Sequence, residues 1–126
     1  LVFVHGLNGH PERTWTDQDT RFFWPRDIHR EIDGIRVVTF GYPAGVEWSL
    51  SRNLMGIHDH AVDLLTLLRN ERDSTSSTTP LIFVCHSLGG LIVKEALISA
   101  QNDENFASIY NCTRALLFFG TPHRGA

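Results

Sequence analysis

The sequence predicts an α/β fold built on a doubly wound parallel sheet, and three observations support that prediction. Short apolar runs alternate with segments of helical periodicity along the 126 residues. The run at residues 81–85 is apolar throughout, which is typical of a strand buried on both faces. Helices placed between strands favour parallel pairing through right-handed crossovers. If the second strand lies outside the first and the third returns to the first strand's other side, the strands take the spatial order 2-1-3-4.

The first third of the chain is expected to hold two strands and one helix. Residues 1–4 are apolar, and a loop rich in glycine follows at residues 5–11. Residues 12–23 show no clear period, so we expect a loop with a helical turn. The aromatic side chains in and after it are expected to cover the core rather than form an aromatic cage; they are Trp15, Phe22, Phe23 and Trp24. A helix should open at residues 24–28, with Pro25 at the favoured first position and Gly34 as its stop. The second strand is expected at residues 35–40.

The rest of the chain continues the alternation. Residues 44–53 support no firm prediction, and the spacing of apolar residues then predicts a helix over residues 54–72. A flexible Ser/Thr loop is expected at residues 74–79, a strand at 81–85, and a helix at 91–100. Residues 101–113 are expected to be a polar connection, 114–119 the fourth strand, and 120–125 a loop. The helix over residues 54–72 rests on Ile57, Ala61, Leu64, Leu65 and Leu68.

The turn at residues 86–90 organises the predicted site. Ser87 stands between a buried strand and an apolar helix, the arrangement in which a strained turn exposes a nucleophilic serine. The backbone N–H of Leu88 lies beside it at a helix N-terminus, where it can stabilise an oxyanion. The alternative is that Ser87 merely caps the helix. A cap alone requires neither the paired glycines after Ser87 nor the histidine before it.

A second loop is predicted to meet this turn. Ligands of doubly wound sheets bind at the carboxyl ends of the strands where the winding reverses, here between the first and third strands. Residues 5–7 and 86–88 emerge at that point. Leu7, directly after His5 and Gly6, is therefore expected to supply a second oxyanion N–H, unless the turn simply needs glycine. His5, Gly6, His86 and Gly89 are expected to organise these loops.

Three motifs together resemble a known group of enzymes. VFVHGLNG, CHSLGGLIVKEAL and LLFFGTPHRGA are similar to lipase-like serine hydrolases of the SERAC and GPI-inositol-deacylase kind, including N-terminal modules of fungal NACHT and ankyrin-repeat proteins. The resemblance covers nearly the whole chain and implies an α/β-hydrolase fold, Ser87 as nucleophile, ester or lipid-acyl substrates and no cofactor. It also implies an intracellular location, in the cytoplasm or at mitochondrial or ER membranes. Cys85 stands where the family pattern has a small glycine.

The catalytic acid and base are expected beyond residue 126. Hydrolases of this fold carry their triad in the order Ser, acid, His, and the base follows a later strand. His123 is therefore expected to line the pocket or fix its loop, with a role as base the less favoured alternative. His58 and His60 resemble metal ligands, but residues two apart on a helix face different directions, so no metal site is predicted.

Composition excludes several classes of protein. The net charge is −3 with no basic cluster, which argues against nucleic-acid binding, and no stretch is apolar for long enough to cross a bilayer. Cys85 and Cys112 should lie at opposite ends of the sheet, too far apart for a disulfide, which suits a reducing compartment. Both ends of the chain lie close to apolar strands, so residues 1–126 are expected to be part of one hydrolase domain.

The sequence thus predicts a serine hydrolase that acts on small-molecule or lipid esters. The alternative is a signalling or recognition module with little or no turnover, linked covalently to further domains of a NACHT-type protein. A purely structural fragment is a third class. An acid and a histidine in later loops would favour the enzyme, whereas a following nucleotide-binding module would favour signalling.

Overall fold

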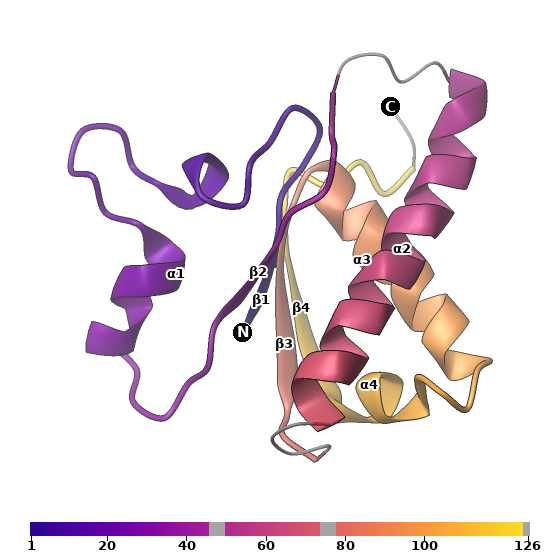
Figure 1. The fold of residues 1–126 in the computed structure, drawn as a ribbon. Helices are drawn as coiled ribbons and strands as arrows, with labels where there is room; N and C mark the ends of the chain where they lie inside the picture. Colours follow the sequence, from indigo (N-terminus) through magenta and orange to yellow (C-terminus); the bar gives the residue numbers. More distant parts are fainter. Residues whose placement is uncertain (46–49, 74–77, 125–126) are drawn as a thin grey trace.

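The computed structural model describes residues 1–45, 50–73 and 78–124, and shows a sheet between two layers (Figure 1). One face of the sheet carries helices α2 (Leu50–Asp73), α3 (Leu88–Gln101) and α4 (Ala107–Cys112). The other face carries the segment between the first two strands, which contains the short helix α1 (Trp24–Asp27). Buried apolar side chains form a cluster on each face.

The sheet contains parallel strands in the order β2-β1-β3-β4, as the sequence predicts. The strands are β1 (Val2–Val4), β2 (Val38–Phe40), β3 (Leu81–His86) and β4 (Thr113–Phe119). Val4 pairs with both Phe40 and Cys85, and Cys85 pairs with Phe118. The four strands therefore end at one edge, and the loops that follow β1 and β3 leave the sheet as neighbours.

The two cysteines lie at opposite ends of this sheet, as predicted. Cys85 is near the carboxyl end of β3, whereas Cys112 directly precedes the first residue of β4. This separation leaves no geometry for a disulfide between them.

The segment between β1 and β2 contains less regular structure than predicted. The helical turn expected within residues 12–23 is the 3-10 turn η1 (Arg13–Trp15). The helix expected to run to Gly34 is α-helical only in α1 and continues as the 3-10 turn η2 (Ile28–Arg30). Ile32 is 47% exposed, so beyond η2 the expected apolar face has no core to pack against, and a short helix without tertiary support is marginal. β2 likewise begins at Val38 rather than at residue 35.

Helices α2 and α3 both begin earlier than predicted. α2 starts at Leu50, and its predicted apolar positions are confirmed, because Ala61, Leu64 and Leu65 are each at most 1% exposed. α3 starts at Leu88, directly after Ser87. Gly89 and Gly90, expected in the turn, form its first turn. Burial against the strands there outweighs the low helix propensity of glycine.

The prediction of a polar connection over residues 101–113 is wrong, because α4 lies within it. Ile109 is fully buried, and Phe106 packs against the same apolar cluster as α2 and α3. Two apolar residues at helical spacing among polar neighbours are a weak sequence signal, and their burial supports less than two turns of helix. The loop predicted over residues 74–79 falls largely on 74–77, outside the described residues, as does Gly125 of the last loop.

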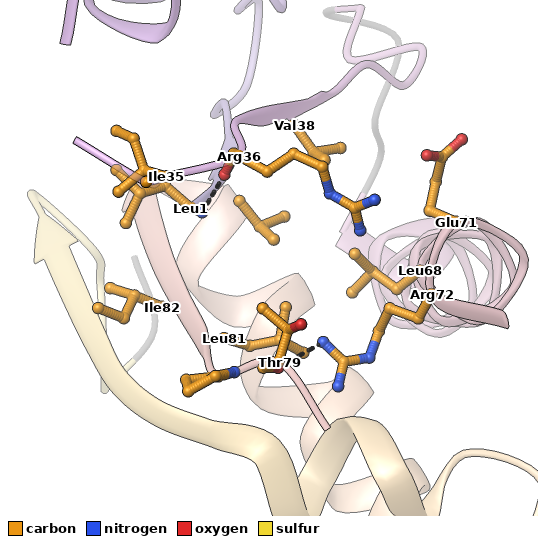
Figure 2. A pocket seen from close by; sticks show the side chains of 13 residues that line it. Leu1, Ile35, Arg36, Val38, Leu68, Glu71, Arg72, Thr79, Leu81 and Ile82 are labelled. Carbon is orange, nitrogen blue, oxygen red and sulfur yellow. Dashed lines mark hydrogen bonds between the residues drawn. The ribbon is translucent and has the colours of Figure 1, made fainter. Parts of the chain in front are cut away.

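A cavity of about 240 Å³ lies at the amino ends of the strands (Figure 2). Val38 and Leu81, the first residues of their strands, form part of its wall together with Leu68 and Arg72 of α2. Arg72 Nη1 donates a hydrogen bond of 2.8 Å to the carbonyl oxygen of Thr79. The cavity therefore lies at the amino ends of the strands, whereas the loops that follow β1 and β3 lie at the carboxyl ends.

Of the helices described, none is both long enough and apolar enough to span a bilayer.

Candidate active site

Ser87 lies at the apex of a sharp turn between β3 and α3. Its backbone has a φ of 49° and a ψ of −121°, a conformation that residues with a side chain rarely adopt and that costs about 1–3 kcal/mol. Its hydroxyl makes no capping hydrogen bond to α3. Ser87 therefore lacks the hydrogen bond that would make it a helix cap. Capping does not account for its strained backbone conformation.

Two glycines let the backbone approach closely enough to build this turn. A side chain at Gly89 would collide with the carbonyl oxygens of Val4 and His5, so α3 can cross the end of β1 only with glycine at this position. A Cβ atom at Gly6 would lie 2.7 Å from Ser87 Cβ and 2.9 Å from the carbonyl oxygen of His86. The loop after β1 therefore packs directly against the turn after β3.

The loop after β1 leaves the N–H of Leu7 without a hydrogen-bond acceptor in the described part of the chain. Its neighbours are fixed, because Asn8 N–H donates to the carbonyl oxygen of Ala44 at 2.7 Å and Gly9 N–H to that of Gly6 at 2.9 Å. The loop is thus held at both sides of one unused donor. Because Gly6 lies against Ser87, the N–H of Leu7, one residue further along, is suited to bind an oxyanion.

The N–H of Leu88 is the corresponding donor on the other loop. Among the residues that the structure describes it also has no acceptor, as expected for the first N–H of a helix. Ser87 N–H donates to the carbonyl oxygen of Phe119 at 2.8 Å, and Gly90 N–H to that of Ser87 at 3.1 Å. These bonds fix the turn around Leu88, and the helix N-terminus adds a partial positive charge.

His5 is fully buried beneath the first loop and has a defined hydrogen-bonding role. Its Nδ1 lies 2.9 Å from the carbonyl oxygen of Gly6, to which it can only donate, and Nε2 accepts the N–H of Tyr42 at 3.3 Å. This network assigns the neutral tautomer, in agreement with the lowered pKa of His5 that follows from its burial. Since both ring nitrogens are occupied, His5 supports the loop and is not available as a base for Ser87.

Tyr42 holds His5 in place and was not among the residues singled out from the sequence. Its ring stacks on that of His5 with a centroid separation of 4.3 Å, and its hydroxyl donates to the carbonyl oxygen of His5 at 2.8 Å. The available signal is its position directly after β2, at the carboxyl edge of the sheet where site residues gather.

The other two histidines near the turn are exposed. His86 has its ring edge-on to Trp15, with centroids 6.4 Å apart. His123 lies edge-on to Phe118 at 4.8 Å, and its Nδ1 is 3.5 Å from Lys94 Nζ. Since an ammonium group can only donate, Nδ1 is the acceptor in this contact and is engaged with Lys94 rather than with Ser87.

The histidines of α2 lie in different environments. His58 Nδ1 is 3.0 Å from Glu95 Oε1 of α3, whereas the His60 ring packs against Tyr42 at 4.6 Å. Within residues 1–45, 50–73 and 78–124 no group of three potential ligands is placed to hold a metal ion.

A pocket of about 320 Å³ adjoins the turn on the face of the sheet that the α1 segment covers. Its side chains are mainly aromatic and come from Trp15, Trp24, His86 and Phe119, with Asp17 and threonines at the polar side. Trp15 covers the core as predicted, packing on Phe3 with centroids 5.0 Å apart. Trp24 is 42% exposed, and its ring meets that of the buried Phe3 edge-on with centroids 6.4 Å apart, so it lies over the core as predicted and also faces the pocket.

Comparisons with known proteins agree with the α/β architecture of the fold. The sequence model of the alpha/beta hydrolase family matches residues 1–125. The chain is 26% identical over its whole length to the Homo sapiens protein named SERAC1, and 28% identical to the Bos taurus protein of that name. The Danio rerio SERAC1 is 27% identical over 99% of the chain. The chain spans 22% of the length of each of these proteins. No solved structure gives a significant match. These similarities confirm the resemblance to α/β-hydrolases of the SERAC kind that the three motifs predict.

Proposed function

The chain belongs to the alpha/beta hydrolase family, and on that premise we propose that it is a serine hydrolase that cleaves carboxylic esters through an acyl-enzyme on Ser87. Lipid acyl esters fall within this substrate class. Because the chain spans less than a quarter of the SERAC1 proteins, the proposal concerns the reaction of this domain within the whole protein.

The reaction needs a nucleophile, a base and donors for the oxyanion. The Ser87 hydroxyl attacks the ester carbonyl carbon while a base takes its proton, and the carbonyl oxygen becomes an oxyanion. Collapse of the tetrahedral intermediate breaks the carbon–oxygen bond of the ester, and the alcohol leaves with the proton from the base. Water then attacks the acyl-enzyme with the same base, and the carboxylic acid and the free Ser87 hydroxyl are formed.

The oxyanion is assigned to the N–H groups of Leu7 and Leu88. Both donors are unused within the described residues, although their neighbours are hydrogen-bonded. Donors that are fixed before the substrate arrives need no reorganisation, and one such donor typically contributes about 10²–10³ in kcat.

The base and its acid are assigned to residues outside 1–126. His5 has both nitrogens engaged, and His123 faces Lys94. The fold's order of Ser, acid, His places both partners after the nucleophile. Without the base, Ser87 stays protonated and weakly nucleophilic.

The observation that carries the proposal is the strained, uncapped conformation of Ser87. The test is hydrolysis of p-nitrophenyl acetate by the full-length protein and by its Ser87→Ala variant. We expect Ser87→Ala to lower kcat by about 10⁶, as loss of a nucleophilic serine does, with unchanged folding. Ser99→Ala, near the other end of α3, is the matched control and should keep full activity. Equal turnover by the two alanine variants would reject Ser87 as nucleophile.

A further inference from the structure

The pocket beside Ser87 is placed to receive part of the substrate. Its wall includes His86, the residue directly before the nucleophile, and Phe119. The carbonyl oxygen of Phe119 accepts the hydrogen bond from Ser87 N–H, so the end of β4 is fixed against the turn. The pocket therefore begins at the residue next to the nucleophile.

The surface of the pocket is apolar and contains exposed rings. Trp24 and Phe119 are each 42% exposed, and their rings meet edge-to-face with centroids 6.1 Å apart. Within residues 1–126 these rings form an apolar patch, a feature that often marks a ligand-binding surface. Rings that meet at an angle leave an edge and a face open for a third ring, which favours edge-to-face or offset packing.

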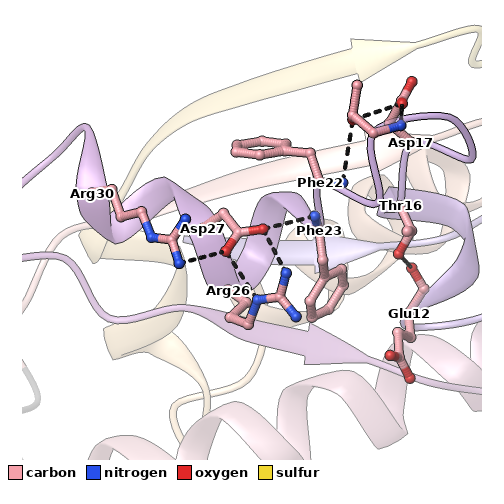
Figure 3. Close-up of polar contacts among 9 residues, drawn as sticks. Glu12, Thr16, Asp17, Phe22, Phe23, Arg26, Asp27 and Arg30 are labelled. Atoms are coloured by element: carbon pink, nitrogen blue, oxygen red, sulfur yellow. Dashed lines mark hydrogen bonds and ion pairs between the residues drawn. The ribbon is translucent and has the colours of Figure 1, made fainter.

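Hydrogen bonds within the segment between β1 and β2, several of which Figure 3 shows, fix in advance of binding the wall that carries Trp15 and Trp24. The Asp27 carboxylate is 3% exposed and accepts hydrogen bonds from Phe23 N–H at 2.9 Å and Arg26 Nη2 at 2.8 Å. These bonds hold the first turn of α1, where Trp24 lies. Thr16 Oγ1 donates to the carbonyl oxygen of Glu12 at 2.9 Å, which closes the turn around Trp15. Because these side chains are already held in place, less conformational entropy is lost when a ligand binds.

The charge at the polar side of the pocket selects against anions. Asp17 Oδ1 accepts hydrogen bonds of 2.7 Å from both the N–H and the hydroxyl of Thr20. These two bonds lower the pKa of Asp17, so its carboxylate is ionised at neutral pH. An ionised carboxylate in the wall repels a carboxylate or phosphate on the bound group.

We propose that this pocket binds one uncharged, ring-bearing or short apolar substituent of the ester on which Ser87 acts. This inference rests on the proposed function. The volume of about 320 Å³ is roughly twice that of a cavity of about 150 Å³ known to hold benzene, so a benzyl-sized group fits with its linking carbon. A long acyl chain would extend beyond the pocket into solvent.

The test uses two isomeric esters, methyl phenylacetate and benzyl acetate, which carry the same ring on the acyl side and on the alcohol side. Binding to the full-length Ser87→Ala protein is measured by calorimetry, so no turnover is needed. We expect micromolar to millimolar binding of at least one isomer, and the preferred isomer identifies the side of the ester that enters the pocket. Phe119→Ala and Trp24→Leu should each weaken that binding about tenfold through the lost ring contact.

Matched controls separate the pocket from general loss of apolar surface. Leu117 is on the same strand and is also 42% exposed but does not line the pocket, so Leu117→Ala should leave binding unchanged. A carboxylate added to the ring should weaken binding at least tenfold, and Asp17→Asn should restore it while Asp19→Asn should not.

Three results would overturn the inference. They are absence of binding by both isomers, equal losses in the Phe119 and Leu117 variants, and undiminished binding of the ring carboxylate. Pocket-dependent binding to Ser87→Ala without hydrolysis by the unmodified protein would instead reject the proposed function and leave the subsite standing. Hydrolysis that depends on Ser87 but not on Phe119 or Trp24 would reject the subsite and leave the proposed function standing.

Discussion

Gly6→Ala is the substitution that most directly tests how the two loops form one site. The added Cβ would lie 2.7 Å from Ser87 Cβ, whereas ordinary contacts begin at 3.4 Å. The loop after β1 and the turn after β3 must therefore separate by about 0.7 Å. The carbonyl oxygen of His86 would lie 2.9 Å from the same Cβ, so backbone as well as side-chain atoms of the turn oppose the added atom. The N–H of Leu7, one residue along, should move away from the oxyanion with its loop.

The expected cost follows from that displacement. A misplacement of about 1 Å in a catalytic constellation can cost about 10²-fold, so we expect kcat for p-nitrophenyl acetate to fall about 10- to 100-fold. Overpacking should lower the free energy of unfolding by about 1–3 kcal/mol. Both quantities are measured on the full-length protein, by steady-state hydrolysis and by urea unfolding.

Gly45→Ala is the control, because no atom of the described residues lies within 4 Å of the Cβ that it would add. It should leave kcat unchanged. If Gly6→Ala keeps the kcat of the unmodified protein, then Leu7 is not an oxyanion donor and the close packing of the loops has no catalytic meaning.

Three further predictions concern the frame of the site. Cys85→Gly should retain activity, whereas Cys85→Leu should overpack the fully buried position beneath α3 and lower the free energy of unfolding in urea by about 1–3 kcal/mol. Tyr42→Phe should keep the stacked ring but leave the buried carbonyl oxygen of His5 without its hydroxyl donor, a loss of about 1–3 kcal/mol in the same assay. Hydrogen bonds from Arg26 and from Phe23 N–H lower the pKa of Asp27 from 3.8 to about 2, so its contribution to stability is complete above the ordinary pKa and is lost as the pH falls towards 2. Asp27→Asn should lower stability at neutral pH and flatten the pH dependence in that range, as thermal unfolding at a series of pH values would show.

The sequence predicts the frame of the fold well because the central strands β1 and β3 are largely buried on both faces. An apolar run such as that of β3 has few alternatives, and right-handed crossovers between the strands leave few strand orders. The position of Ser87 is predicted for the same reason, since a buried strand and a buried helix can be joined by five residues only through a sharp turn. The lengths of α1 and β2 are not predicted, because each depends on how far its neighbours bury its apolar face.

The parts of the site that sequence reasoning missed depend on contacts between distant residues. Tyr42 acts through His5, 37 positions earlier, and no local pattern marks that pair. Trp15 and Trp24 look alike in sequence, yet Trp15 is 8% exposed and Trp24 is 42% exposed. Both line the pocket, and only the path of the segment between β1 and β2 decides how deeply each of them is buried.

The most direct test of the central claim is covalent labelling of the full-length protein with a fluorophosphonate probe, followed by peptide mapping. The probe forms a stable bond only with a serine that a base activates and whose tetrahedral adduct the oxyanion donors stabilise. We predict one labelled site, in the peptide that contains Ser87, and loss of the label in Ser87→Ala but not in Ser99→Ala. A label on a different serine, or undiminished labelling of folded Ser87→Ala, would contradict the assignment of this turn as the nucleophile.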